Sequence, residues 1–301
     1  MKEYLRIEKP VLGYQYEFDL NHLGPMSECV ESHGFAIIKD VLCDSLVELL
    51  KQSVFAACGF RHASDMKNGL KSGESKGHLA WIESNSGAWE LLKHEPFIRV
   101  QRYLTGSNQL TINRSAAIIR MPGFKGTSWH SDWCGFSNKT PQTASDVLNR
   151  GPWLSGTWFY LTGSRPEHGG LCVIEDSHHK GWNGPKGFKL AEDKKTLSGL
   201  ANGLDNYCGY DVPGMVPLFT NPVDLIVFAH RTYHAPFPNQ IDEIRLSCGI
   251  GFRERSYEIE TPWEMPESGK QLLQNLPECL QGYTHGYTSI EADWRAQADS
   301  K

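Results

Sequence analysis

The chain has 301 residues, of which 40% are hydrophobic and 22% charged, with a net charge of −5 and a pI near 6.2. This balance is ordinary for a globular protein and lacks the basic surplus of nucleic-acid-binding proteins, so we expect no nucleic-acid partner. The sequence contains no apolar run of 18 residues, so we expect no membrane span. The charged first residues lack the apolar segment of a signal peptide.

Eight cysteines are scattered along the sequence without a Cys-x-x-Cys pair, which argues against a zinc site. With no export signal in view, we expect reduced and mostly buried thiols in a cytoplasmic protein.

The first third of the chain is predicted to form a support for the fold. Residues 1–28, with several glycines and prolines, predict an irregular lead-in, and residues 33–40 predict a short strand. Ser45 and Glu48 have the spacing of a capping box, which predicts a helix that ends near Gly59.

Two further segments precede the β-rich part of the sequence. Residues 61–87 are rich in Gly, Ser, Lys and His, and predict either a plain surface loop or a loop that lies over a binding site. Residues 89–104 predict a helix that is broken near Pro96 and stops at Gly106.

From residue 110 the pattern changes to short β runs separated by turns. The expected strands cover residues 110–113, 116–120, 153–161, 170–174, 224–230 and 244–252. Many short strands of this kind predict a sandwich or a barrel. The connections 134–152 and 182–218 are long for such a fold, which is typical of functional loops or of segments with local structure.

No linker or internal repeat divides the sequence, so we expect one domain over residues 1–301. Its β core is expected at about 110–255, behind a helical N-terminal support over 30–105 and before a C-terminal tail over 262–301.

The motif with the clearest chemistry is Trp129-His130-Ser131-Asp132. Among twelve histidines, His130 alone has a carboxylate two residues downstream. In an extended strand, residues i and i+2 point to the same side, so this imidazole and carboxylate converge. They supply two thirds of the 2-His-1-carboxylate set that suits Fe(II) and leaves positions open for oxygen chemistry.

A third ligand and an anion-binding residue follow later in the chain. His230 and His234 both come at the end of an expected strand, and either completes the set. Arg245 and Ser247 share one face of the next strand, where a guanidinium binds a carboxylate bidentately and a hydroxyl adds a hydrogen bond. These are the parts needed to hold Fe(II) and a dicarboxylate cosubstrate.

Together these blocks resemble the phytanoyl-CoA dioxygenase family of Fe(II)/2-oxoglutarate-dependent oxygenases. The resemblance covers about residues 30–255, in family order. Residues 168–178 resemble the family's GG-L-x-V-x-PGSH block, with Glu175-Asp176 in place of Pro-Gly. Residues 224–239 resemble its GD-hydrophobic block and the histidine block after it. Arg245 lies 11 residues after His234, the usual family interval, and 15 after His230.

The resemblance implies a mainly β fold with flanking helices, built on a double-stranded β-helix (jelly-roll) core. It implies His130, Asp132 and His234 as iron ligands. It also implies that Arg245, with Ser247, binds the distal carboxylate of 2-oxoglutarate, and that Trp158 lines the cosubstrate pocket.

The implied reaction is the oxidation of a C–H bond in a small molecule with Fe(II), 2-oxoglutarate and O2, giving succinate and CO2. Halogenating relatives have Gly or Ala in place of the aspartate, so Asp132 disfavours halogenation. Ser131 and Trp133 are expected to face the substrate, covered by segments 61–87, 134–152 and 182–218. The protein is expected to be a monomer or a homodimer.

Two other functions compete with this interpretation. One is a jelly-roll protein that binds or senses a small molecule without turnover, and the other is a different mononuclear metalloenzyme, such as an Fe(II) or zinc hydrolase. Arg245 distinguishes a 2-oxoglutarate enzyme from both of these alternatives, because only a 2-oxoglutarate enzyme has a clear use for an Arg-x-Ser after the third ligand.

Overall fold

The computed structural model describes residues 7–62, 64–65, 69–135, 140–151, 155–199 and 206–296. The strands are β1 (Glu17–Phe18), β2 (Phe35–Ile38), β3 (Ser75–Leu79), β4 (Leu110–Arg120), β5 (Ser155–Tyr160), β6 (Leu171–Ile174), β7 (Phe188–Leu190), β8 (Leu197–Gly199), β9 (Met215–Pro217), β10 (Leu225–Ala229), β11 (His234–Pro236) and β12 (Arg245–Glu254). The helices are α1 (Leu23–His33), α2 (Asp44–Ala57), α4 (Trp81–Ser84), α5 (Trp89–Lys93), α6 (Glu95–Thr105), α7 (Ala144–Leu148) and α8 (Glu267–Asn275), with 3-10 turns at Ser86–Ala88 and Glu278–Thr284.

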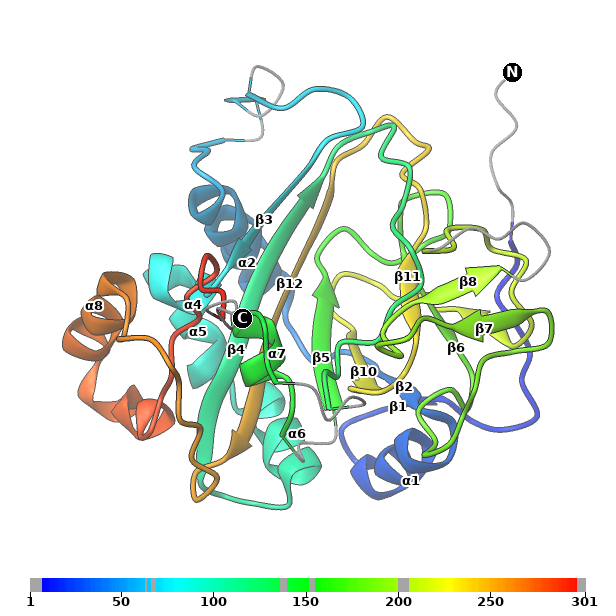
Figure 1. Cartoon of the computed structure of the whole chain (residues 1–301). Helices are drawn as coiled ribbons and strands as arrows, with labels where there is room; N and C mark the ends of the chain where they lie inside the picture. The colour runs from blue at the N-terminus through cyan, green and yellow to red at the C-terminus, as the bar shows by residue number, and fades with distance from the viewer. Residues whose placement is uncertain are drawn as a thin grey trace.

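The strands form a large sheet and two small ones. The large sheet has the order β1-β2-β10-β5-β12-β4-β3, and the small sheets have the orders β11-β6-β9 and β7-β8. Its longest pair, β4 and β12, runs antiparallel, with Arg120 opposite Arg245. Figure 1 shows the large sheet in the middle of the molecule and the small sheets to one side of it.

Helices cover the face of the large sheet that lies away from the small sheets. α2, α4 and α6 contact β4, and α2 and α6 also contact β12 (Figure 1). The main hydrophobic core lies between these helices and the large sheet and extends to residues of β6 and β9. A second cluster around Trp129, Tyr233 and Phe237 lies in the small-sheet layer. The remaining face of β4 and β12 is thereby left toward the small sheets, where a pocket forms.

Most expected strands are present, and two of them, 110–113 and 116–120, are parts of the single strand β4. For the strand expected at 153–161, β5 covers residues 155–160, and residues 152–154 lie outside the described part of the chain. The break expected near Pro96 lies at His94, between α5 and α6. The strands from β4 to β12 coincide with the expected core at 110–255; that the whole chain is one domain stays a prediction.

Three expectations for the N-terminal part are wrong. The lead-in contains helix α1, because Pro25 lies in its first turn, where a backbone N–H has no intrahelical partner. Helix α2 begins at Asp44, and its N-cap Cys43 makes no side-chain capping bond, so Ser45 is not a cap. Segment 61–87 contains β3, an exposed edge strand with too little apolar alternation to be recognised.

All eight cysteines are free, and five of them are buried: Cys29, Cys58, Cys134, Cys172 and Cys248. The expectation of free and mostly buried thiols is confirmed. Within the described residues, the structure contains no helix with the length and apolar character that a membrane crossing requires.

Asp224, which precedes β10, ties the sheet to the chain after β2. Its carboxylate is fully buried, forms an ion pair with Lys39, and accepts backbone hydrogen bonds from Asp40 at 3.1 Å and Asn221 at 2.7 Å. Because Asp224→Ala leaves these donors without their partner, we expect it to lower the free energy of unfolding by about 2–4 kcal/mol in urea denaturation. The exposed Asp242→Ala is the control and should change it by less than about 0.5 kcal/mol. Equal effects of the two substitutions would refute the account.

Candidate metal centre and anion pocket

Three side chains from the sequence motifs converge in the pocket between the sheets. His130, Asp132 and His234 each offer a ligand atom, and these atoms all lie within 4.8 Å of one another. His130 and His234 exchange backbone hydrogen bonds of 3.0 and 2.9 Å and form an isolated antiparallel bridge. Residues 130–132 lie outside the named strands, and the imidazole and the carboxylate still converge, as their spacing predicts.

Backbone carbonyls orient both imidazoles. Nδ1 of His130 lies 2.8 Å from the Ser128 carbonyl oxygen, and Nδ1 of His234 lies 3.0 Å from that of Thr232. A carbonyl oxygen only accepts, so Nδ1 donates in both rings, which leaves Nε2 as the nitrogen that can bind a metal, as in metal-binding histidines. Burial, followed by the neighbouring His130, lowers the pKa of His234 to about 4, so this ring is neutral near pH 7.

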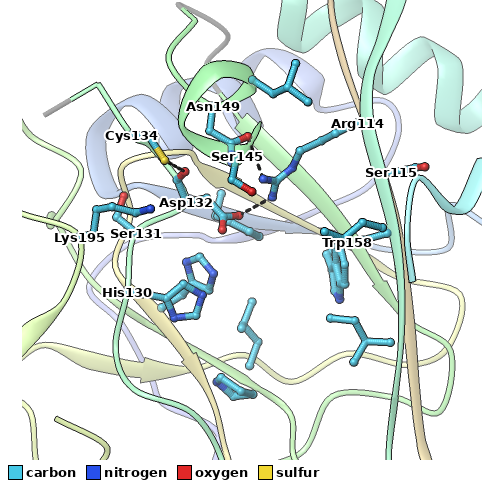
Figure 2. A pocket seen from close by; sticks show the side chains of 18 of the residues that line it. Arg114, Ser115, His130, Ser131, Asp132, Cys134, Ser145, Asn149, Trp158 and Lys195 are labelled. Carbon is cyan, nitrogen blue, oxygen red and sulfur yellow. Dashed lines mark hydrogen bonds and ion pairs between the residues drawn. The ribbon is translucent and has the colours of Figure 1, made fainter. Parts of the chain in front are cut away.

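Asp132 is held by an arginine from β4. Figure 2 shows Arg114 between two partners: its Nη2 donates to Oδ2 of Asp132 at 2.8 Å, and its Nη1 donates to Oδ1 of Asn149 at 2.8 Å. Burial acts to raise the pKa of Asp132, but Arg114 and the nearby imidazoles together hold it well below its usual range. The carboxylate is therefore ionised at neutral pH, and Oδ1 remains outside this ion pair.

Arg245, at the start of β12, is the anion-binding candidate. Its side chain is 1% exposed, and its guanidinium donates to the Gly169 carbonyl at 2.8 Å and to Oγ of Ser247 at 3.1 Å. The ring of Tyr160 lies beneath it, 4.9 Å from the guanidinium carbon to the ring centroid. Burial lowers the pKa of Arg245, yet an arginine stays protonated at neutral pH. The hydrogen bond to Ser247 thus fixes the orientation of the Arg245 guanidinium.

A pocket of about 470 Å³ is lined by His130, Asp132, His234 and Arg245. Its apolar wall includes Ile118, Leu171 and Phe228, which come from both layers of the fold. Each of the three long segments expected to cover a substrate contributes to the lining: Leu79 from 61–87, Ser145, Leu148 and Asn149 from 134–152, and Lys195 and Thr196 from 182–218.

Trp158 and Ser131, both expected at the site, line the pocket. The ring of Trp158 lies over Gly249, where an added Cβ would approach it to 2.4 Å, so the glycine leaves the space that the indole fills. Oγ of Ser131 donates to the His230 carbonyl at 3.0 Å, and the side chain is 1% exposed.

Trp133 and His230 are also candidates from the sequence, but the structure does not bring them into the site. Trp133 does not line the pocket: its ring packs against the Arg231 guanidinium at 3.9 Å, and its Nε1 donates to Gly151. The pocket thus gives no support to the substrate role expected of Trp133. His230 is not among the convergent ligand atoms, and His234 is.

The sequence analysis missed two basic residues of β4, Arg114 and Arg120, which line the pocket together with Arg245. A signal was available, because both lie at alternate positions in a largely apolar strand. That is the pattern by which Arg245 was singled out on β12. Asn149 and Lys195, from long connections, carried no such signal.

Several solved structures have a similar fold, and two of those described next hold 2-oxoglutarate. The epimerase SnoN, in complex with Fe3+, alpha ketoglutarate and nogalamycin RO, aligns at 16% identity and a TM-score of 0.55, over 93% of this chain and 97% of that one. EctD from S. alaskensis aligns at 18% identity and a TM-score of 0.53, over 80% and 81%. EvdO2 from Micromonospora carbonacea var. aurantiaca, complexed with 2-oxoglutarate, aligns at 19% and 0.51, over 75% and 88%.

These likenesses establish the fold as the double-stranded β-helix of Fe(II)/2-oxoglutarate enzymes, with helices flanking the sheets. The sequence model of the phytanoyl-CoA dioxygenase (PhyH) family matches residues 30–247. The chain therefore belongs to this family of Fe(II)/2-oxoglutarate-dependent dioxygenases. A search of curated proteins found no match to the sequence.

Proposed function

We propose that this protein oxidises a C–H bond of a small molecule, with His130, Asp132 and His234 as the ligands of Fe(II). The observation that carries the proposal is the convergence of these ligand atoms in the same pocket as a buried arginine. Two imidazoles with free Nε2 atoms and one ionised carboxylate are the donor set that suits Fe(II). SnoN with Fe3+ and alpha ketoglutarate, and EvdO2 with 2-oxoglutarate, show that similar folds accept these groups.

The remaining site residues bind, orient and exclude water. Arg245 binds the distal carboxylate of 2-oxoglutarate, and Ser247 fixes the guanidinium through its 3.1 Å hydrogen bond. Trp158 borders the cosubstrate. When bound, iron and 2-oxoglutarate would supply the oxidation with O2 as the oxidant, one oxygen atom going to succinate, which forms with CO2 from the cosubstrate, and the other to the substrate. The apolar wall keeps bulk water away from the reacting C–H bond.

We propose that the substrate binds on the side of the pocket lined by Ser145, Asn149 and Lys195, where Asn149 accepts a hydrogen bond from Arg114. Oxygenation is favoured over halogenation, because Asp132 fills the position that a halide takes in halogenating relatives. We propose hydroxylation as the outcome, with natural-product or secondary metabolism as the setting.

A metabolite-library screen for substrate-triggered succinate tests this proposal. Protein supplied with Fe(II), 2-oxoglutarate and O2 should release succinate faster with at least one compound, and mass spectrometry should find that compound oxidised. The same screen with His234→Ala gives the background. Decarboxylation that no compound stimulates above this background, by a protein that binds 2-oxoglutarate, would favour a binding or sensing role.

Arg114 is expected to set the orientation of Asp132. Because Arg114→Gln removes the ion pair, we expect Fe(II) affinity to fall by about 10- to 100-fold, the usual effect of losing a partner of a metal ligand. Arg114→Lys keeps the charge and should recover part of the loss. Anaerobic titration with Fe(II) measures both values. An unchanged affinity in Arg114→Gln would show that Asp132 needs no such support.

A further inference from the structure

Two buried arginines face each other at one end of the pocket. Arg120 ends β4 and Arg245 begins β12, and they are direct partners across the two strands. Residues directly opposite on antiparallel strands point to the same side of the sheet, and both of these line the pocket. Arg120 is 8% exposed and Arg245 is 1% exposed, so both charges have left bulk water.

The described residues offer this arginine pair (Arg120 and Arg245) no carboxylate partner. Neither residue takes part in any of the ion pairs found between described residues. Nε and Nη1 of Arg120 and Nε of Arg245 have no hydrogen-bond partner among the residues that the structure describes. The Arg120 guanidinium stacks on the ring of Phe124 at 4.3 Å, whereas Arg245 uses its terminal nitrogens on Gly169 and Ser247.

This arrangement is unfavourable by itself. Like charges placed directly opposite on neighbouring strands destabilise a sheet, and a buried donor without a partner adds to the cost. Burial, followed by repulsion from Arg245, lowers the pKa of Arg120 to about 9, which is consistent with this unfavourable placement of two like charges. One anion that accepts hydrogen bonds from both guanidinium groups removes the repulsion and satisfies the donors.

We propose that Arg120 binds the cosubstrate together with Arg245, so that one carboxylate, the distal carboxylate of 2-oxoglutarate, lies between the two guanidinium groups. The proposal rests on the proposed function, because it concerns the ligand of the same pocket. Arg245 is largely fixed by protein partners, and Arg120 supplies the unpartnered donors. The pair therefore makes the pocket selective for a 2-oxo acid that carries a second carboxylate.

An anionic group on the substrate is the other ligand that could use Arg120. The two sources are separated by testing cosubstrate binding alone, without any substrate. Anaerobic protein loaded with Fe(II) is titrated with 2-oxoglutarate or with 2-oxopentanoate, which keeps the chelating 2-oxo acid but lacks the distal carboxylate. The growth of the visible charge-transfer band measures binding without turnover.

We expect Arg120→Gln to bind 2-oxoglutarate about 10- to 100-fold more weakly, the effect of losing hydrogen bonds from a charged donor. Its affinity for 2-oxopentanoate should be unchanged, because that ligand has no carboxylate to place between the arginines. Arg120→Lys should recover part of the affinity. The matched control is Lys125→Gln, which removes an exposed positive charge outside the pocket lining and should bind both ligands as the wild type does.

Folding does not confound the comparison, because Arg120→Gln relieves a repulsion, and its thermal midpoint without ligand should equal or exceed that of the wild type. If the wild type forms the band and Arg120→Gln binds 2-oxoglutarate with equal affinity, the role proposed for Arg120 is refuted, and the proposed function is not. An equal loss for 2-oxopentanoate would also overturn that role. A wild-type protein that forms no band with Fe(II) and 2-oxoglutarate would overturn the proposed function and the arginine pair together.

Discussion

Replacing His234 with alanine is expected to abolish tight Fe(II) binding, with a loss of at least about 100-fold, more than the loss of a supporting residue causes. The imidazole is 7% exposed, and its Nδ1 is committed to the Thr232 carbonyl, which leaves Nε2 facing His130 and Asp132. Two remaining ligands do not enclose one face of the metal. Calorimetric titration of anaerobic protein with Fe(II) measures the change.

His230→Gln is the matched control for that result, since His230 precedes His234 by four residues and is likewise buried. Its ring is outside the convergent set, so Fe(II) affinity should stay within about threefold of the wild type, allowing for a small structural effect. Loss of Fe(II) binding in His230→Gln with retention in His234→Ala would mean that the wrong histidine has been assigned.

Replacing Arg245 with alanine is expected to weaken 2-oxoglutarate binding by about 10- to 150-fold, the range for hydrogen bonds to a charged group. Fe(II) binding should persist, because Arg245 is not among the convergent ligand atoms. The two affinities are measured on the same anaerobic sample, first with Fe(II) and then with 2-oxoglutarate. This separation of the two affinities would identify Arg245 as a cosubstrate residue and not a structural support of the metal.

Arg165→Ala is the control for Arg245→Ala, because it removes an arginine that lies outside the pocket. Arg165 donates to the carbonyls of Ser164 and Thr220 and lies near the ring of Phe219, but it does not line the pocket. It should bind 2-oxoglutarate as the wild type does. Equal losses in Arg165→Ala and Arg245→Ala would point to a general destabilisation and against a specific contact.

The sequence predicts the parts of the site that are local or regularly spaced. His130 and Asp132 are two residues apart, and Arg245 follows His234 at a fixed interval, so short-range geometry and the family resemblance together bring them out. Arg114 could not be paired with Asp132 in this way. Its contact depends on how β4 lies against the connection that follows it, a tertiary arrangement that no spacing encodes.

The fold likewise has elements that the local sequence predicts and elements that it does not. The buried strand β10 is an apolar run and β12 is apolar over much of its length, so their sequences predict them well. The edge strand β3 is exposed and polar, so its pairing with β4 leaves no pattern in its own sequence. Helix α1 is difficult to recognise in the sequence because Gly24 and Pro25 lie in its first turn. These residues usually interrupt helices but are tolerated there.

The departure from the family pattern at Glu175-Asp176 has a local explanation. Asp176 has φ of 61°, a left-handed conformation that glycine adopts most easily and that aspartate tolerates better than most residues. Its carboxylate accepts a hydrogen bond from Nδ1 of His33 at 3.2 Å, and its N–H donates to the His33 carbonyl at 3.2 Å. The end of α1 thus fixes the turn after β6, away from the ligand atoms.

The visible spectrum of the protein with Fe(II) and 2-oxoglutarate, recorded without oxygen, tests the central claim most directly. Addition of 2-oxoglutarate to the Fe(II) protein should produce a weak charge-transfer band, which Asp132→Ala and Arg245→Ala should each weaken or abolish. A native protein that develops no band and binds no 2-oxoglutarate would contradict the assignment of His130, Asp132 and His234 as an iron site served by Arg245.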